Sequence, residues 1–211
     1  LGQFKPKLSL RSVAKQKKAL ILVTKESHCL RDLLYLQELG ELPIEIPAVV
    51  SNHSDLKTLV ESHGIKFIDQ SKLVKADAEA EISKLVSELE IDLVVLARYM
   101  QILTKEFCEK MFGRIINIHH SFLPGFKGAK PYHQAYDRGV KVIGATAHYV
   151  TSDLDEGPII EQILTRVDHG YGPEHLVRVG RDNECMALAK AVKYHIERRV
   201  FLDGNKTVIF L

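Results

Sequence analysis

Short apolar runs alternate with amphipathic segments along most of the chain. Short runs rich in Val, Ile and Leu, three to seven residues long here, are typical of strands buried inside a sheet. Five such strands are predicted, at residues 18–24, 44–50, 66–68, 93–97 and 115–119. Prolines in the second run place that strand near a sheet edge or shorten it. Strands separated by helices predict an α/β fold with a doubly wound, mainly parallel sheet.

The segments between these strands predict the covering helices. Ser27 is a candidate cap for a helix that stops at Gly40, and Ser54 is a candidate cap for a short helix that closes at Gly64. A third helix follows from apolar residues at the spacing i, i+3, i+4 and i+7. These residues are Ile82, Leu85, Val86 and Leu89. A fourth helix is predicted over residues 104–111, just before the fifth strand.

The last third of the chain departs from that alternation. A helix around residues 131–139 precedes two apolar strands, 142–150 and 159–167, which are joined only by a loop. Pro173 suits the first turn of a long C-terminal helix, in which Gly180 is a candidate kink. The apolar stripe of this helix is Cys185, Leu188, Ala189, Val192 and Ile196. A hairpin around Asp-Gly-Asn follows, with its strands at residues 200–202 and 207–210.

Composition narrows the class of protein. The 211 residues are 45% hydrophobic and 27% charged, enough to bury the core of one domain. We assign residues 18–211 to that domain and residues 1–17, which are locally basic, to a solvated lead-in. A net charge of +2 predicts no nucleic-acid partner. Three scattered cysteines, the lack of a signal peptide and the lack of an apolar run of about 18 residues predict a cytoplasmic protein without a membrane partner.

Asn117-x-His119 at the end of the fifth strand is the first candidate for chemistry. Side chains alternate along a strand, so Asn117 and His119 face one way and Ile116 and Ile118 the other. An amide beside an imidazole can donate a hydrogen bond to a carbonyl oxygen and transfer a proton. The same pair can also be a buried strand end whose polar groups tie down loops. The later segment from His148, which reads His-Tyr-Val-Thr-Ser-Asp-Leu-Asp-Glu-Gly-Pro, favours chemistry.

Ligands of parallel sheets bind outside the carboxyl ends of the strands. Four segments are expected to reach that edge, at residues 24–29, 97–103, 119–130 and 151–158.

Three ordered motifs resemble the folate-dependent formyltransferase superfamily, whose fold is Rossmann-like. Residues 96–103, Leu-Ala-Arg-Tyr-Met-Gln-Ile-Leu, are similar to its pterin-pocket wall, and Asn117 with His119 resembles its catalytic pair. Residues 148–160 are similar to the loop that carries its catalytic aspartate, here Asp155. The resemblance covers most of residues 18–211. It implies folate-binding residues at Met100, Gln101, Ile102, Leu103, Thr146, His148, Thr151, Ser152, Asp153 and Leu154.

The loop after the first strand separates two members of this superfamily. Glycinamide ribonucleotide formyltransferases hold a phosphate there in a glycine-rich loop, because backbone N–H groups must close on the oxyanion. Residues 24–32 contain no glycine and include Glu26, although Lys25 or the helix start can still meet a phosphate. Residues 25–30, 117–124, 128–136 and 143–150 resemble the 10-formyltetrahydrofolate deformylases. That family usually carries an N-terminal ACT-type domain, so residues 1–17 are interpreted as a linker from it.

The resemblance implies hydrolysis of 10-formyltetrahydrofolate to tetrahydrofolate and formate. Asn117 would donate to the oxyanion, His119 would donate a hydrogen bond or proton, and Asp155 would orient water and shuttle protons. His148 and Thr146 either support the site or pack in the core. His120, adjacent to His119, is expected to point elsewhere.

Other groups around the site leave alternatives open. Lys127, Lys130 and Arg138 form a basic rim for the glutamate tail of folate or are ordinary solvated charges. With no His-Glu-x-x-His motif, no clustered Cys/His pattern and no Gly-x-Ser-x-Gly elbow, we expect neither a metal nor a cofactor beyond the folate substrate, and no serine hydrolase.

The function expected from the sequence is therefore a deformylase that supplies formate for purine biosynthesis and balances the one-carbon folate pools. Its expected partners are 10-formyltetrahydrofolate, water and further copies of the chain in a homo-oligomer. The alternatives are a glycinamide ribonucleotide formyltransferase and a folate-binding module without catalysis.

Overall fold

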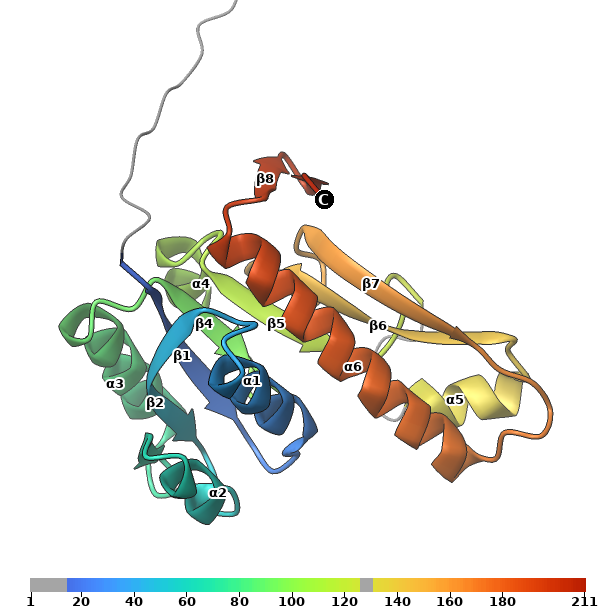
Figure 1. Cartoon of the computed structure of the whole chain (residues 1–211), viewed down its shortest axis with the longest axis horizontal. Coiled ribbons are helices and arrows are strands. Elements are labelled where there is room, and N and C mark those ends of the chain that lie inside the picture. Colours follow the sequence, from blue (N-terminus) through green and yellow to red (C-terminus); the bar gives the residue numbers. More distant parts are fainter. Residues whose placement is uncertain (1–14, 126–130) are drawn as a thin grey trace, which may run out of the picture.

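The computed structural model describes residues 15–125 and 131–211, which form one mixed sheet with helices on both faces and a separate hairpin (Figure 1). The sheet has seven strands in the order β3-β2-β1-β4-β5-β6-β7. These strands are β1 (Lys17–Val23), β2 (Ile44–Ser51), β3 (Lys66–Asp69), β4 (Leu93–Leu96), β5 (Ile115–His119), β6 (Val142–Tyr149) and β7 (Ile159–Arg166). The first five are parallel to one another, and β6 runs antiparallel to both of its neighbours, β5 and β7, which confirms the mainly parallel sheet.

The helices follow the predicted order. They are α1 (His28–Glu38), α2 (Lys57–Ser62), α3 (Lys75–Glu88), α4 (Lys105–Lys110), α5 (Pro131–Arg138) and α6 (Pro173–Ile196). The C-terminal hairpin is formed by β8 (Val200–Asp203) and β9 (Lys206–Ile209), as its turn residues predicted. Within residues 15–125 and 131–211, no helix has both the length and the apolarity that a membrane span requires.

Two apolar clusters lie on opposite faces of the sheet. Ile21 packs with α1, α2 and α6 on one face, where Leu188 belongs to the same buried cluster. Leu20 packs with α3 and α4 on the other face, where it shares a cluster with Ile82. Successive residues of β1 thus point into different cores, which explains why that strand reads as an unbroken apolar run. Each fully buried Leu or Ile contributes roughly 1.5–3 kcal/mol to folding.

The second strand lies next to the edge strand, as its prolines suggested. β3 pairs only with Ala48–Ser51 of β2, so the first half of β2 has one free side. On the other side, the register with β1 shifts between Lys18 and Leu20, opposite Pro47. A proline that cannot donate to the ladder is accommodated at this irregularity.

Three predictions about the helices were wrong in detail. Ser54 does not cap α2: the N-cap is Leu56, because the carbonyl of Ser54 instead accepts from the Lys57 amide in a preceding turn. Ser27 stands at the N-cap of α1, but its side chain makes no capping bond there. Gly180 does not kink or split α6, which is continuous.

Gly180 has a packing role. A Cβ at this position would lie 2.1 Å from Cζ of Tyr132, so glycine lets the ring of Tyr132 sit directly on the backbone of α6. α5 and α6 are packed side by side, as Figure 1 shows, and this contact sets their separation.

Candidate active site

The strand edge that the sequence predicted as the ligand site lines one large cavity of about 640 Å³. Segments after β1, β4 and β5 reach it directly, as expected for parallel strands. The segment after β6 reaches it differently. Because β6 is antiparallel to β5, Tyr149 lies opposite Ile116, and residues 150–158 fold back so that Asp155 meets His119.

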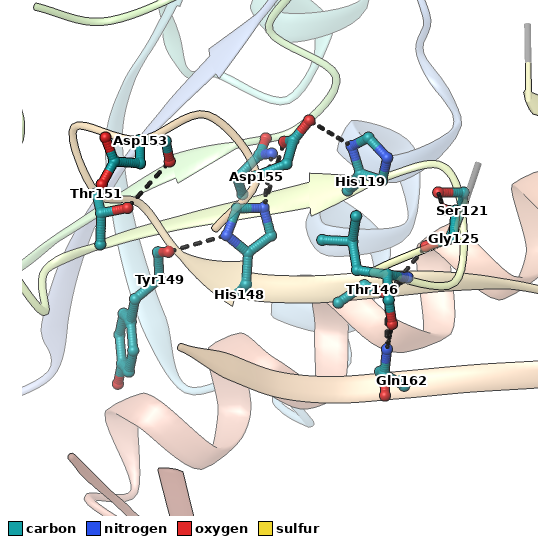
Figure 2. A network of polar contacts seen from close by, with 12 residues as sticks. His119, Ser121, Gly125, Thr146, His148, Tyr149, Thr151, Asp153, Asp155 and Gln162 are labelled. Carbon is teal, nitrogen blue, oxygen red and sulfur yellow. Dashed lines mark hydrogen bonds and ion pairs between the residues drawn. The ribbon is translucent and has the colours of Figure 1, made fainter. Parts of the chain in front are cut away.

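A network of polar side chains joins the predicted catalytic residues (Figure 2). Asp155 Oδ2 lies 3.2 Å from His119 Nδ1, and Asp155 Oδ1 lies 3.7 Å from His148 Nε2. Asn117 is the direct cross-strand neighbour of His148, and its Nδ2 lies 3.2 Å from His148 Nε2. Antiparallel pairing of β5 and β6 therefore brings the three predicted catalytic side chains to one place.

The hydrogen bonds of His148 fix its tautomer. Its Nδ1 lies 2.9 Å from the carbonyl oxygen of Tyr149, to which it must donate. Burial lowers the pKa of His148, so the ring is neutral and its Nε2 accepts from the amide of Asn117. One N–H of Asn117 is occupied in this way, and the amide plane is held in place. No further hydrogen bond of this amide is made to the described residues, so its second N–H can donate to a ligand.

His119 has one ring nitrogen paired with the protein and one without a partner among the described residues. The side chain is buried, with 5% of the residue exposed, and its Nδ1 donates to Asp155. Its Nε2 is buried and has no hydrogen-bond partner among the described residues, while His119 lines the cavity. A buried ring nitrogen without a partner costs free energy unless a ligand supplies one. Nε2 is thus the atom placed to exchange a proton with a ligand.

Asp155 is held as a carboxylate in a rare backbone conformation. Burial raises its pKa, but the hydrogen bond from His119 and the electrostatic attraction between the two side chains outweigh it, so the pKa lies below its usual value. Its φ of 58° falls in the left-handed region that favours glycine. Strain of this kind is concentrated at functional sites.

Gly157 allows the loop of Asp155 to close on the sheet. A Cβ there would lie 1.7 Å from the carbonyl oxygen of Tyr149 and 3.3 Å from Nδ1 of His148. Glycine is required because the loop backbone passes directly over the carbonyl group that orients His148.

The expected folate-binding residues mostly line the cavity. One part of its lining is formed by Leu96, Met100, Gln101, Ile102, Leu103, Val150, Thr151, Ser152, Asp153 and Leu154. The positions predicted from residues 100–103 and 151–154 are thus brought together, and their role in binding stays a prediction. Of the rim residues, Arg138 is exposed, and Lys127 and Lys130 lie outside the described residues.

Two expectations about polar residues need correction. Thr146 is fully buried and does not line the cavity; its hydroxyl accepts from the Leu123 amide and donates to the Ser121 carbonyl. His120 does not point elsewhere, because β5 ends at His119 and side-chain alternation ends with it. Its ring lies 5.2 Å from that of His119 and also lines the cavity.

A second polar group, which was not predicted from the sequence, also lines the cavity. Glu184 of α6 is only 1% exposed and accepts a 2.8 Å hydrogen bond from His28 and another from Tyr132. Arg98, which has a φ of 64°, lies 3.5 Å from the same carboxylate. The sequence did contain a signal for this buried carboxylate, because Glu184 lies four positions before Leu188 and so falls on the apolar stripe of α6.

Among the described residues, one group has the spacing of a metal site: the ligand atoms of His28, Cys29 and Glu184 lie within 4.8 Å of one another. Its chemistry does not favour a cation. The Arg98 guanidinium is already paired with Glu184, and burial together with a hydrogen bond to Cys185 raises the pKa of the Cys29 thiol. A protonated thiol is a poor metal ligand.

Comparison with known proteins identifies the class that this sheet and site belong to. A family model described as formyl transferase matches residues 17–192. A formyltetrahydrofolate deformylase from Corynebacterium sp. (strain P-1) is 56% identical over 202 residues, which are 95% of this chain and 71% of the relative. The chain therefore belongs to the formyl transferase family and, within it, to the formyltetrahydrofolate deformylases.

Among solved structures, a deformylase is more similar to this chain in sequence than a glycinamide ribonucleotide transformylase is. The crystal structure of formyltetrahydrofolate deformylase from Burkholderia mallei ATCC 23344 matches with a TM-score of 0.91 and 56% identity, over 95% of this chain and 72% of that one. Glycinamide ribonucleotide transformylase 1 from Symbiobacterium toebii shares the fold, with a TM-score of 0.87 over 97% of this chain and 99% of that one, but only 27% identity.

Proposed function

We propose that the protein hydrolyses 10-formyltetrahydrofolate to tetrahydrofolate and formate. The observation that carries the proposal is the network of Asn117, His148, Asp155 and His119 in the cavity of a chain that belongs to the deformylase family. A folate-binding module without catalysis would have no need of a strained Asp155 or of an unpartnered ring nitrogen on His119.

The geometry supports a direct division of roles. Water adds to the formyl carbon, and the oxyanion that develops receives the second N–H of Asn117. His148 fixes the orientation of that amide and touches no reacting atom itself. Asp155, held as a carboxylate, accepts the proton that the attacking water must lose.

Collapse of the tetrahedral intermediate breaks the bond between the formyl carbon and N10 of folate. The departing nitrogen needs a proton, and Nε2 of His119 is the group placed to deliver it. Asp155 at Nδ1 stabilises the imidazolium form that donates. The apolar end of the cavity, at residues 100–103, would receive the pterin ring.

Turnover with water alone tests the function. Purified protein incubated with 10-formyltetrahydrofolate should release formate and tetrahydrofolate in equal amounts, and glycinamide ribonucleotide should not change the rate. Strict dependence on that acceptor would show a formyltransferase instead, and tight folate binding without product would show a binding module.

The proposed reaction also suggests a cellular role. Formate released by the enzyme would feed purine biosynthesis, and loss of the formyl group would return tetrahydrofolate to the one-carbon pool. Three unpaired cysteines, two of them buried, suit a reducing compartment such as the cytoplasm.

A further inference from the structure

The cavity continues past the catalytic residues into a polar end. The ring of His120 lies 5.2 Å from His119 on one side and 6.4 Å from Tyr132 on the other. The hydroxyl of Tyr132 then donates to Glu184 at 2.8 Å. A continuous row of side chains thus connects the reacting centre with the helices α1, α5 and α6. A second substrate would have to approach from this end, since the opposite end is the one suited to folate.

The polar end is closed by a carboxylate that has all its partners within the protein. Burial raises the pKa of Glu184, but the hydrogen bond from His28 and the charge of Arg98 outweigh it and leave the pKa below its usual value. Removing one partner of such a buried charge is strongly destabilising, so the cluster resists opening. Gly180 adds rigidity, because it fixes the ring of Tyr132 against α6.

A second ion pair lies outside this cluster. Oε2 of Glu26, in the glycine-free loop after β1, is 2.9 Å from Nη2 of Arg181 on α6 and 3.7 Å from Nδ1 of His28. The two side chains are 43% and 48% exposed, so this pair stands between the buried cluster and solvent. It joins the loop after β1 to the helix that carries Glu184.

We propose that Glu26, Arg181 and Glu184 select water over amines as the acceptor of the formyl group, an inference that rests on the proposed function. A nucleophile must come within about 3–3.5 Å of the formyl carbon. Water needs no further room. A phosphorylated amine would have to break the Glu26–Arg181 pair and bring its phosphate beside two carboxylates, where like charges repel.

The alternative reaction is balanced without any further reagent. In transfer to an amine, the bond from the formyl carbon to N10 breaks, a bond to the acceptor nitrogen forms, and a proton of the acceptor moves to N10. The catalytic residues required are the same. Hydrolysis and transfer then differ only in which acceptor can enter at the polar end. The quantity to measure is therefore the share of formyl groups that reaches an amine instead of water.

The test is the ratio of formylated amine to formate, measured by mass spectrometry with 10-formyltetrahydrofolate and excess glycinamide or glycinamide ribonucleotide. Glu26→Ala with Arg181→Ala should raise the ratio for glycinamide ribonucleotide about tenfold over wild type, because the carboxylate that repels its phosphate at the entrance is removed. Lys84→Ala with Glu88→Ala removes a comparable exposed ion pair on α3 and should leave the ratio unchanged.

Glu184→Gln provides a second variant, which keeps the size of the buried side chain and removes its charge. It should also raise the ratio. An unchanged ratio in both variants, each folded and still releasing formate, would overturn the proposal. Formate release by the wild type with water alone tests the hydrolase function separately. A failure of the proposed function can therefore be told apart from a failure of the proposed selection of water.

Discussion

Nδ1 of His119 lies 3.2 Å from Oδ2 of Asp155, while Nε2 of the same ring is buried without a partner among the described residues. The ring is therefore oriented by one nitrogen and left free to react at the other. Asp155 reaches this position only because the loop after β6 folds back over Gly157.

Replacing Asp155 by Asn should abolish most of the turnover and leave the fold intact. The substitution keeps the size of the side chain but removes the proton acceptor, and loss of a general base typically costs about 10²–10⁴ in rate. Formate release and the thermal unfolding temperature should be measured together. Asp203→Asn, in the exposed hairpin, is the matched control. A stable Asp155→Asn variant with near-normal turnover would end the proposed mechanism.

Gly157→Ala should disrupt the site through packing. The added Cβ would lie 1.7 Å from the carbonyl oxygen of Tyr149, so either the loop or β6 must move. Overpacking of this kind costs typically about 1–3 kcal/mol, and displacement of Asp155 should reduce turnover as well. Gly172→Ala is the control, because nothing lies within 4 Å of its added Cβ. Equal unfolding free energies for the two variants would contradict the packing argument.

Thr146→Val should weaken stability more than folate binding. The hydroxyl serves the Leu123 amide and the Ser121 carbonyl, and it lies outside the cavity lining. Leaving these buried groups unpaired costs roughly 1–3 kcal/mol in unfolding free energy, whereas the KM for folate should change little. Thr146→Ser restores the hydroxyl and should recover the stability. A large rise in KM at unchanged stability would return Thr146 to the binding site.

Mild acid should destabilise the fold through its buried histidines. Burial, the largest cause, lowers the pKa of His120 and of His195 to about 4, and it also lowers that of His148. Because the unfolded chain then binds more protons, the free energy of unfolding should fall as pH drops below about 6.5 towards the folded pKa values. Each histidine contributes about 1.4 kcal/mol per pH unit in that window. Urea unfolding across the window measures the slope.

A single variant tests which histidines produce this slope. His195 Nδ1 lies 2.7 Å from the hydroxyl of Tyr149, and His195→Gln keeps an acceptor there while removing the titrating group. The slope should decrease relative to wild type. His169→Gln changes an exposed histidine and should leave it unchanged. Identical slopes for wild type and His195→Gln would show that the destabilisation arises elsewhere.

Exhaustive chelation should not reduce turnover. His28, Cys29 and Glu184 have the distances of a metal site, but Arg98 already neutralises Glu184. Activity should be assayed after dialysis against EDTA and again after addition of single divalent ions. Loss of activity that one ion restores would show that this cluster, or another, holds a metal.

The sequence predicted the sheet well because its strands are buried on both faces and therefore read as apolar runs. It also predicted that Asn117 and His119 lie together at the cavity, since they share one face of β5, and their catalytic role stays a prediction. It failed where side chains from distant elements meet. No local pattern indicates that Tyr132 rests on Gly180, or that Glu184, on an otherwise apolar stripe, is buried against His28. His120 was misplaced because strand alternation ends at His119.

The residue pairs that meet in the two parts of the cavity are separated by very different lengths of chain. Asn117 and His148 are 31 positions apart, whereas His28 and Glu184 are 156 positions apart. By the logarithmic dependence of loop-closure entropy on length, the longer closure costs about 1.4 kcal/mol more. The network of Asn117, His148 and Asp155 can therefore assemble from one contiguous stretch of chain. The contacts proposed to select water instead join the loop after β1 to α6, the last long helix. Partial opening of these contacts would therefore change the acceptor of the formyl group while the catalytic residues stayed assembled.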